Sequence, residues 1–86
     1  MENKDKESSG PKIIIMSESP SLEQAQELVG GRVERILLPD GRRMLVDEEG
    51  AFPKGLDINL TASVLADQPI VGDAIILDEG VGENEW

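Results

Sequence analysis

The chemistry that this sequence could carry is concentrated in three adjacent carboxylates. Asp47, Glu48 and Glu49 follow a run of strand-forming residues and precede Gly50. Carboxylate oxygens are ligands for hard cations, and two carboxylates can act as a general acid and a general base. Adjacent acidic residues in a turn, however, point in alternating directions and are ordinarily solvated. We therefore expect a structural turn here, with a cation site or an acid–base pair as the alternative.

The arginines form a second candidate site. They lie close together in the sequence, at Arg32, Arg35, Arg42 and Arg43. Guanidinium groups make bidentate contacts with carboxylates and phosphates, so this basic group could receive an acidic partner or a phosphate. We favour the alternative in which Arg35 and Arg43 pair with neighbouring acidic residues such as Glu34 and Asp47.

Asn59 precedes a short apolar segment, residues 60–66, and two roles suit it. As a helix N-cap, its side-chain oxygen would accept a hydrogen bond from a backbone N–H of the first turn. As a binding residue, it would make a polar contact in a pocket. The capping role is favoured because asparagine is a preferred residue directly before a helix.

The sequence lacks the groups on which most catalytic sites depend, because it contains no histidine and no cysteine. The usual nucleophile–base pairs, the ordinary structural zinc site and disulfides are therefore excluded. Gly30-Gly31 follows a predicted helix, whereas a phosphate-binding glycine loop precedes one. We expect a protein that is not an enzyme and that binds no cofactor.

An amphipathic helix is predicted between residues 19 and 30. Ser19-Pro20 offers one start, and Ser21 with Gln24 offers a capping box slightly later. Gly30-Gly31 ends the helix, because glycine readily adopts the left-handed conformation of a C-cap. Four apolar residues share one face at helical spacing: Leu22, Ala25, Leu28 and Val29.

Strands are predicted on both sides of this helix. The β-branched run at residues 12–16 indicates a buried strand, and residues 32–38 and 42–47 indicate a hairpin joined by Pro39-Asp40-Gly41. A short helix over residues 60–66 and a last strand over residues 70–77 follow. The order strand, helix, strand, strand, short helix, strand predicts an α+β fold: a small mixed sheet of about four strands with one amphipathic helix packed on it.

The hairpin has two apolar faces if Leu38 pairs with Arg42. The more apolar face, which should cover the first helix, holds Ile36, Leu38, Met44 and Val46. The opposite face places Arg35 and Arg43 beside Val33, Leu37 and Leu45, and it is too apolar for a fully solvated surface.

The domain is expected to span residues 11–77, between a disordered tail over residues 1–10 and an acidic, flexible tail over residues 78–86. About 67 residues form a core that supplies only ~3–5 kcal/mol, and small domains often add a staple. Because disulfides and zinc are excluded here, self-association is the expected supplement. We predict a homodimer.

The chain is acidic, with 18 acidic and 8 basic residues and a net charge of −10. Such a charge repels phosphate, so we expect no direct binding of nucleic acid. No apolar run approaches the ~20 residues that span a bilayer, so no membrane contact is expected. The absence of cysteine fits a reducing compartment, and we predict a cytoplasmic location.

Several short pieces of the sequence occur together in an order that is typical of one family. The pieces are Leu28-Val29-Gly30-Gly31, the Asp40-Gly41 hairpin, Val46-Asp47-Glu48-Glu49-Gly50, Lys54-Gly55-Leu56 followed by Asn59, Thr61 and Ala62, and Ile70-Val71-Gly72-Asp73-Ala74. In these pieces the chain resembles a family of small phage- and plasmid-encoded proteins known as a domain of unknown function. It differs at Asp47, where the family pattern has asparagine, and at Leu56-Asp57-Ile58, where the pattern has Leu-Pro-Pro. The resemblance implies a phage or mobile element inside a bacterial cell, and it implies no catalytic residues.

The expected function is that of a non-catalytic interaction module that binds a host or phage protein. The residues expected to take part in binding are Arg32, Arg35, Arg42, Arg43, Asp47, Glu48, Glu49 and Asn59. One alternative is an acidic inhibitor that imitates DNA and occupies a nucleic-acid-binding enzyme of the host. A second alternative is a protein that binds a nucleotide or a cation through the carboxylates and arginines.

Overall fold

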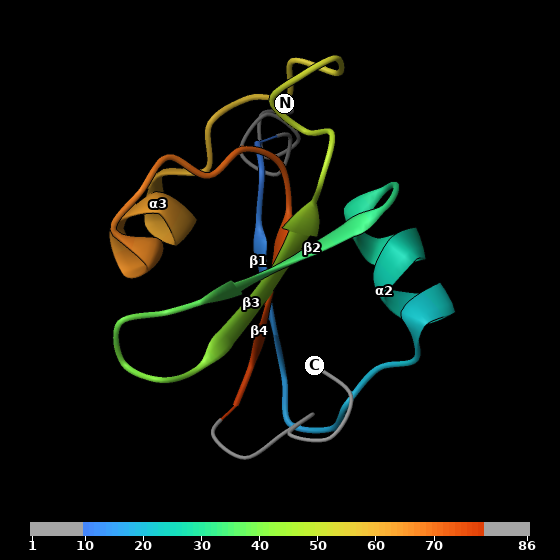
Figure 1. The fold of residues 1–86 in the computed structure, drawn as a ribbon, viewed down its shortest axis with the longest axis vertical. Helices are drawn as coiled ribbons and strands as arrows, with labels where there is room; N and C mark the ends of the chain where they lie inside the picture. The colour runs from blue at the N-terminus through green and yellow to red at the C-terminus, as the bar shows by residue number, and fades with distance from the viewer. Residues whose placement is uncertain (1–9, 79–86) are drawn as a thin grey trace, which may run out of the picture.

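The computed structural model describes residues 10–78, so the predictions for residues 1–9 and 79–86 fall outside the described part. The elements follow one another as β1 (Ile13–Met16), α2 (Leu22–Val29), β2 (Val33–Leu37), β3 (Arg43–Asp47), α3 (Leu60–Ala66) and β4 (Ala74–Leu77) (Figure 1). The strands form one sheet in the order β1-β4-β3-β2. β1 and β4 are parallel, and the other neighbours are antiparallel. The predicted α+β fold with a mixed four-stranded sheet is confirmed.

Helix α2 begins at the capping box rather than at Ser19-Pro20. The Ser21 hydroxyl accepts a hydrogen bond from the Gln24 backbone N–H, and the Gln24 side chain accepts one from the Ser21 N–H. The helix ends at Gly30, whose φ of 92° lies in the left-handed region. Of the predicted apolar face, Ala25 and Val29 are buried, while Leu22 and Leu28 are exposed.

The β2–β3 hairpin has the predicted register. Leu38 pairs with Arg42, since the Leu38 N–H donates to the Arg42 carbonyl at 2.7 Å. The turn closes with a hydrogen bond from the Gly41 N–H to the Leu38 carbonyl at 2.9 Å, and Gly41 has a φ of 97°. A left-handed residue at this position is what selects glycine.

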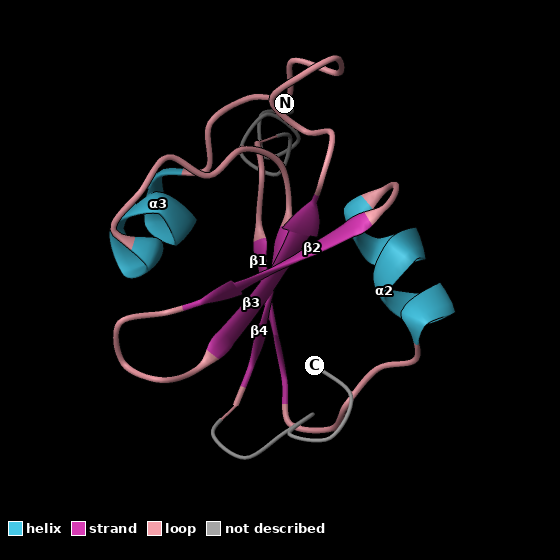
Figure 2. Ribbon diagram, in the orientation of Figure 1, coloured by secondary structure: helices cyan, strands magenta, loops and turns pink. Residues whose placement is uncertain are grey.

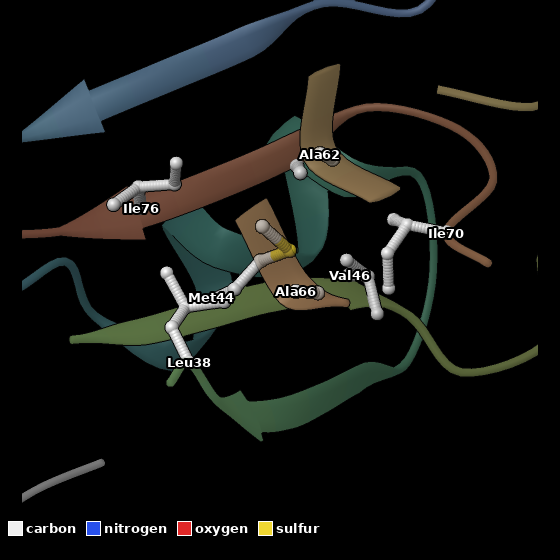
Figure 3. Packing of buried hydrophobic residues seen from close by; sticks show 8 residues of the cluster. Leu38, Met44, Val46, Ala62, Ala66, Ile70 and Ile76 are labelled. Atoms are coloured by element: carbon white, nitrogen blue, oxygen red, sulfur yellow. The ribbon is translucent and has the colours of Figure 1, made fainter. Parts of the chain in front are cut away.

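The two helices lie on opposite faces of the sheet (Figure 2). The prediction that the face with Leu38, Met44 and Val46 covers the first helix is wrong. That face packs on α3, with Ala62 and Ala66 (Figure 3). The other face covers α2 through two side chains from the hairpin, Val33 and Leu45, and two from the helix, Ala25 and Val29. Both faces of the hairpin are apolar because each has a helix to bury.

Strand β1 lies at an edge of the sheet, and it is only half-buried rather than buried as predicted. Its most exposed residue is Ile15, at 62%. The last strand is shorter than predicted: β4 begins at Ala74, and the preceding segment makes a single bridge between Ile58 and Val71. Within residues 10–78, neither helix has the length and hydrophobicity needed to cross a membrane.

Candidate functional site

A loop over residues 48–56 begins at the predicted carboxylate turn. It connects β3 to the segment before α3. In Figure 1 this 48–56 loop, coloured yellow-green to yellow, projects from the end of the sheet. Its first anchor is Asp47, whose side chain is only 1% exposed. One oxygen of Asp47 accepts the Glu49 N–H at 2.9 Å, and the other lies 2.6 Å from the Lys54 Nζ. Asp47 is therefore turned into the molecule, and it is not part of a solvated acidic patch.

Lys54 joins the loop to α2. Its ammonium group donates to Asp47 and also, at 2.8 Å, to the carbonyl of Gly30 at the C-terminus of the helix. A cation is favourable at this end of a helix because the helix carbonyls carry partial negative charge. A Cβ atom on Gly31 would lie 2.6 Å from the Lys54 Nζ, so a larger residue there would displace the ammonium group from this position.

The second half of the loop packs against the segment that precedes β4. The Leu56 N–H donates to the Gly50 carbonyl at 2.8 Å, and the Gly72 N–H donates to the Asp57 carbonyl at the same distance. A Cβ atom on Gly72 would lie 2.8 Å from the Leu56 side chain, and one on Gly50 would lie 3.0 Å from the Val71 side chain. A larger residue at either position would displace these side chains, and the φ of 77° at Gly72 also favours glycine there.

Asn59 caps α3, as predicted, and it is buried. Its side-chain oxygen accepts the Ala62 N–H at 3.1 Å. Its amide nitrogen donates to the carbonyls of Lys12, at 3.1 Å, and Gly72, at 2.9 Å. Asn59 therefore ties α3 to the start of β1 and to the segment before β4, and its side-chain bonds are used within the fold.

The arginines do not form one site. Arg35 and Arg43 lie on the α2 face of the hairpin. Arg43 is directly opposite Leu37 in the register, Arg35 is two residues before Leu37, and Leu37 is 68% exposed. Arg32 precedes β2. Arg42 lies in the hairpin turn, where its guanidinium pairs with Asp40 at 2.9 Å. The side-chain hydrogen bond from Arg42 lowers the pKa of Asp40 below its ordinary value of 3.8. The predicted pairing with Asp47 does not occur, because Lys54 occupies that carboxylate.

The most exposed large apolar side chain among residues 10–78 is one that the sequence reasoning did not single out. Phe52 is 84% exposed. It sits in the middle of the 48–56 loop, between Glu49 and Lys54, whose carbonyl and N–H are joined by a hydrogen bond of 3.2 Å. The sequence could have indicated this exposure, because its sole phenylalanine stands between two turn-forming stretches, where no core would bury it.

Comparison with known protein families gives a match over most of the chain. A family model described as "Domain of unknown function (DUF3846)" matches residues 5–85. The chain belongs to this family. The resemblance to a domain-of-unknown-function family that the sequence pieces indicate is thus confirmed. No curated protein and no solved structure matches the chain.

In this DUF3846 chain, the pieces that carry the family resemblance build the base of the 48–56 loop. Gly30-Gly31, Asp47 and Lys54 meet at one side of it. Gly50, Leu56 and Gly72 meet at the other. These positions are far apart in the sequence, and the fold brings them together at the base of the loop.

The geometry also bears on the alternative of a cation site in this DUF3846 domain. Asp47 points inward to Lys54, while Glu48 is exposed and Glu49 is half-buried. Within the part of the chain that the structure describes, acidic side chains do not gather in groups of three or more that could hold a metal ion. Small hollows flank the loop instead: one of 110 Å³ beside Glu48, Ala51 and Pro69, and one of 280 Å³ beside Leu56 and Asp57. A broader depression of 660 Å³ lies on the open surface of α2 and reaches Gly30 and Gly31 at the C-terminus of the helix.

Proposed function

We propose that this DUF3846 protein acts without catalysis, by binding another protein through its 48–56 loop. The observation that carries the proposal is the 84% exposure of Phe52 in the middle of that loop. An exposed aromatic side chain is a common anchor of protein interfaces, because its burial in a partner's pocket removes a large apolar area from water.

The construction of the loop supports this role. Asp47, Lys54 and Leu56 fix the two ends of the loop through an ion pair, backbone hydrogen bonds and close glycine contacts. A loop that is held in place before binding loses little conformational entropy when it meets its partner. Phe52 is thus presented on a support that the rest of the fold stabilises.

The charge around the loop indicates what kind of partner suits it. Glu48 and Asp57 are exposed near the two ends of the loop, and the whole chain carries a net charge of −10. An apolar pocket with a basic rim would complement this surface and would be approached faster at low salt. In this proposal the partner is a host or phage protein inside a bacterial cell, a setting that rests on the resemblance of the sequence pieces.

Affinity capture from bacterial cells carrying a phage or mobile element tests the proposal. Phe52→Ala should remove at least one partner that the unchanged protein captures. The matched control is Leu37→Ala, which removes another exposed apolar side chain, at the end of β2 next to the hairpin turn. Circular dichroism checks that both variants are folded. Capture that is equal for Phe52→Ala and the unchanged protein would refute the assignment of the loop.

The alternatives receive less support from the structure. The helices and strands of residues 10–78 expose only three carboxylates, Glu23, Glu27 and Glu34, whereas a DNA mimic needs many of them on ordered elements. Competition against DNA for host nucleases, with a steep salt dependence, would favour the mimic. A rise in melting temperature with divalent cations or nucleotides would favour the ligand-binding alternative.

A further inference from the structure

One edge of the sheet has backbone groups that face away from the domain. β1 is the end strand, and within residues 10–78 it pairs only with β4. The carbonyls of Lys12 and Met16 accept hydrogen bonds from the Ala74 and Asp78 N–H groups, at 3.0 and 3.1 Å. Because backbone groups alternate in direction along a strand, the N–H and C=O groups of Ile13 and Ile15 point to the outside.

Although β1 is short and follows Pro11 and Lys12, the strand itself has no residue that blocks pairing with another strand. Natural edge strands are commonly blocked by charged side chains, proline or a bulge. β1 has the sequence Ile-Ile-Ile-Met, without a charge, and Ile15 is 62% exposed. The opposite edge differs, because β2 exposes Glu34 and Arg35. An antiparallel pairing of β2 with itself, centred on its middle residue, would place Arg35 opposite Arg35, which is unfavourable.

We propose that two copies of this chain pair through β1. The strands run antiparallel around a two-fold axis at Ile14, so that Ile13 lies opposite Ile15 of the partner subunit. In this register the outward backbone groups of the two residues exchange both of their hydrogen bonds. The two sheets become one continuous sheet, and no backbone group has to leave β4.

The side chains also favour a second copy as the occupant. Ile15 would be covered by the partner's Ile13, and Ile13 already packs against the core under α3. Lys12, which directly precedes β1, lies opposite the partner's Met16, and the partner's Glu18 follows in the bend at the end of its strand. Both charged residues are exposed in one copy. The antiparallel direction therefore brings the basic start of each β1 toward the acidic segment that follows the other β1. The edge is therefore complementary to itself in hydrogen bonding, apolar contact and charge.

Sedimentation velocity over a range of protein concentrations tests this inference. The unchanged chain should be a dimer, and Ile15→Lys should weaken the association by about tenfold or more. The matched control is Leu37→Lys, which makes the same change at a residue of similar exposure, 68%, on the other edge strand. The control should remain as dimeric as the unchanged chain. A monomeric unchanged chain, or an equal loss in both variants, would overturn the proposal.

A charge exchange tests the register independently. Lys12→Glu places like charges near Glu18 of the partner subunit and should weaken the dimer. Adding Glu18→Lys restores the opposite charges and should restore the association. The Lys12 Nζ also lies 4.0 Å from a carboxylate oxygen of Asp73 in its own chain, so Lys12→Glu alone could weaken the dimer indirectly. The recovery of association in the double variant is therefore the decisive measurement. A double variant as weak as Lys12→Glu alone would rule out the antiparallel pairing around Ile14, as would a dimer that forms through another surface.

Discussion

At the scale of single residues, one ammonium group connects the 48–56 loop to two other parts of the chain. Lys54 contacts the end of β3 through Asp47 and the end of α2 through the Gly30 carbonyl. The carboxylate of Asp47 is buried, and a buried charge without a partner is strongly unfavourable. The stability of the domain therefore depends on this cation more than on its surface ion pairs.

Replacing Lys54 tests that dependence. Lys54→Met should lower the free energy of unfolding by about 2–3 kcal/mol, less than for a fully buried pair because water screens part of the interaction. A third of the Lys54 side chain, 34%, is exposed. The control is Lys12→Met, compared in the Ile15→Lys background where the proposed association is weakened. Its ion pair with Asp73 is 4.0 Å long and exposed, so the free energy should change by less than about 0.5 kcal/mol. Urea unfolding measures both. Equal losses would contradict the role of Lys54.

A second prediction at this scale concerns pH. The hydrogen bond from Arg42 lowers the pKa of Asp40 below 3.8, so Arg42→Gln should raise that pKa toward its ordinary value. Since the folded pKa is the lower one, the stabilisation is complete above the ordinary value and is lost as the pH falls through the folded value. A carboxyl-carbon NMR titration reports the shift. An unchanged titration of Asp40 in Arg42→Gln would disprove this cause.

At the scale of elements, Asn59 determines how α3 is attached. Asn59→Ala removes the cap and leaves the Lys12 and Gly72 carbonyls without their donor, so the free energy of unfolding should fall by about 3 kcal/mol. Asn59→Asp keeps the cap but places a carboxylate against two carbonyls, and it should also be unstable. The exposed cap of α2 is the control, since Ser21→Ala should lose only about 1 kcal/mol. Thermal and urea unfolding distinguish these cases, and a loss in Asn59→Ala no larger than in Ser21→Ala would contradict the attachment role.

The elements themselves were largely predictable from the sequence, while their arrangement was not. Local signals at Ser21, Gly30 and Gly41 are enough to begin a helix, end it and close a hairpin. The choice of face for each helix depends on contacts between distant segments, and a hairpin that is apolar on both sides fits either choice. The same limit applies to the candidate site. In the sequence, Asp47 does not differ from a solvated acidic residue. The structure brings Lys54, seven residues later, into contact with its carboxylate.

At the scale of the whole molecule, the proposed pairing through β1 makes stability depend on concentration. The melting temperature of the unchanged chain should rise as the protein concentration is increased, because the dimer forms only from folded copies. The melting temperature of Ile15→Lys should depend less on concentration, and Leu37→Lys should behave like the unchanged chain. Calorimetry at several concentrations measures this. A constant melting temperature for the unchanged chain would count against a dimer linked to folding.

The position of β4 in the sheet has a consequence for biosynthesis. β4 is the last described element in the sequence, yet it lies between β1 and β3 and is the only neighbour of β1 among residues 10–78. While the chain emerges from the ribosome, β1 has no strand to pair with until β4 has been translated. The domain should therefore fold in a single late step after translation, without a stable nascent intermediate.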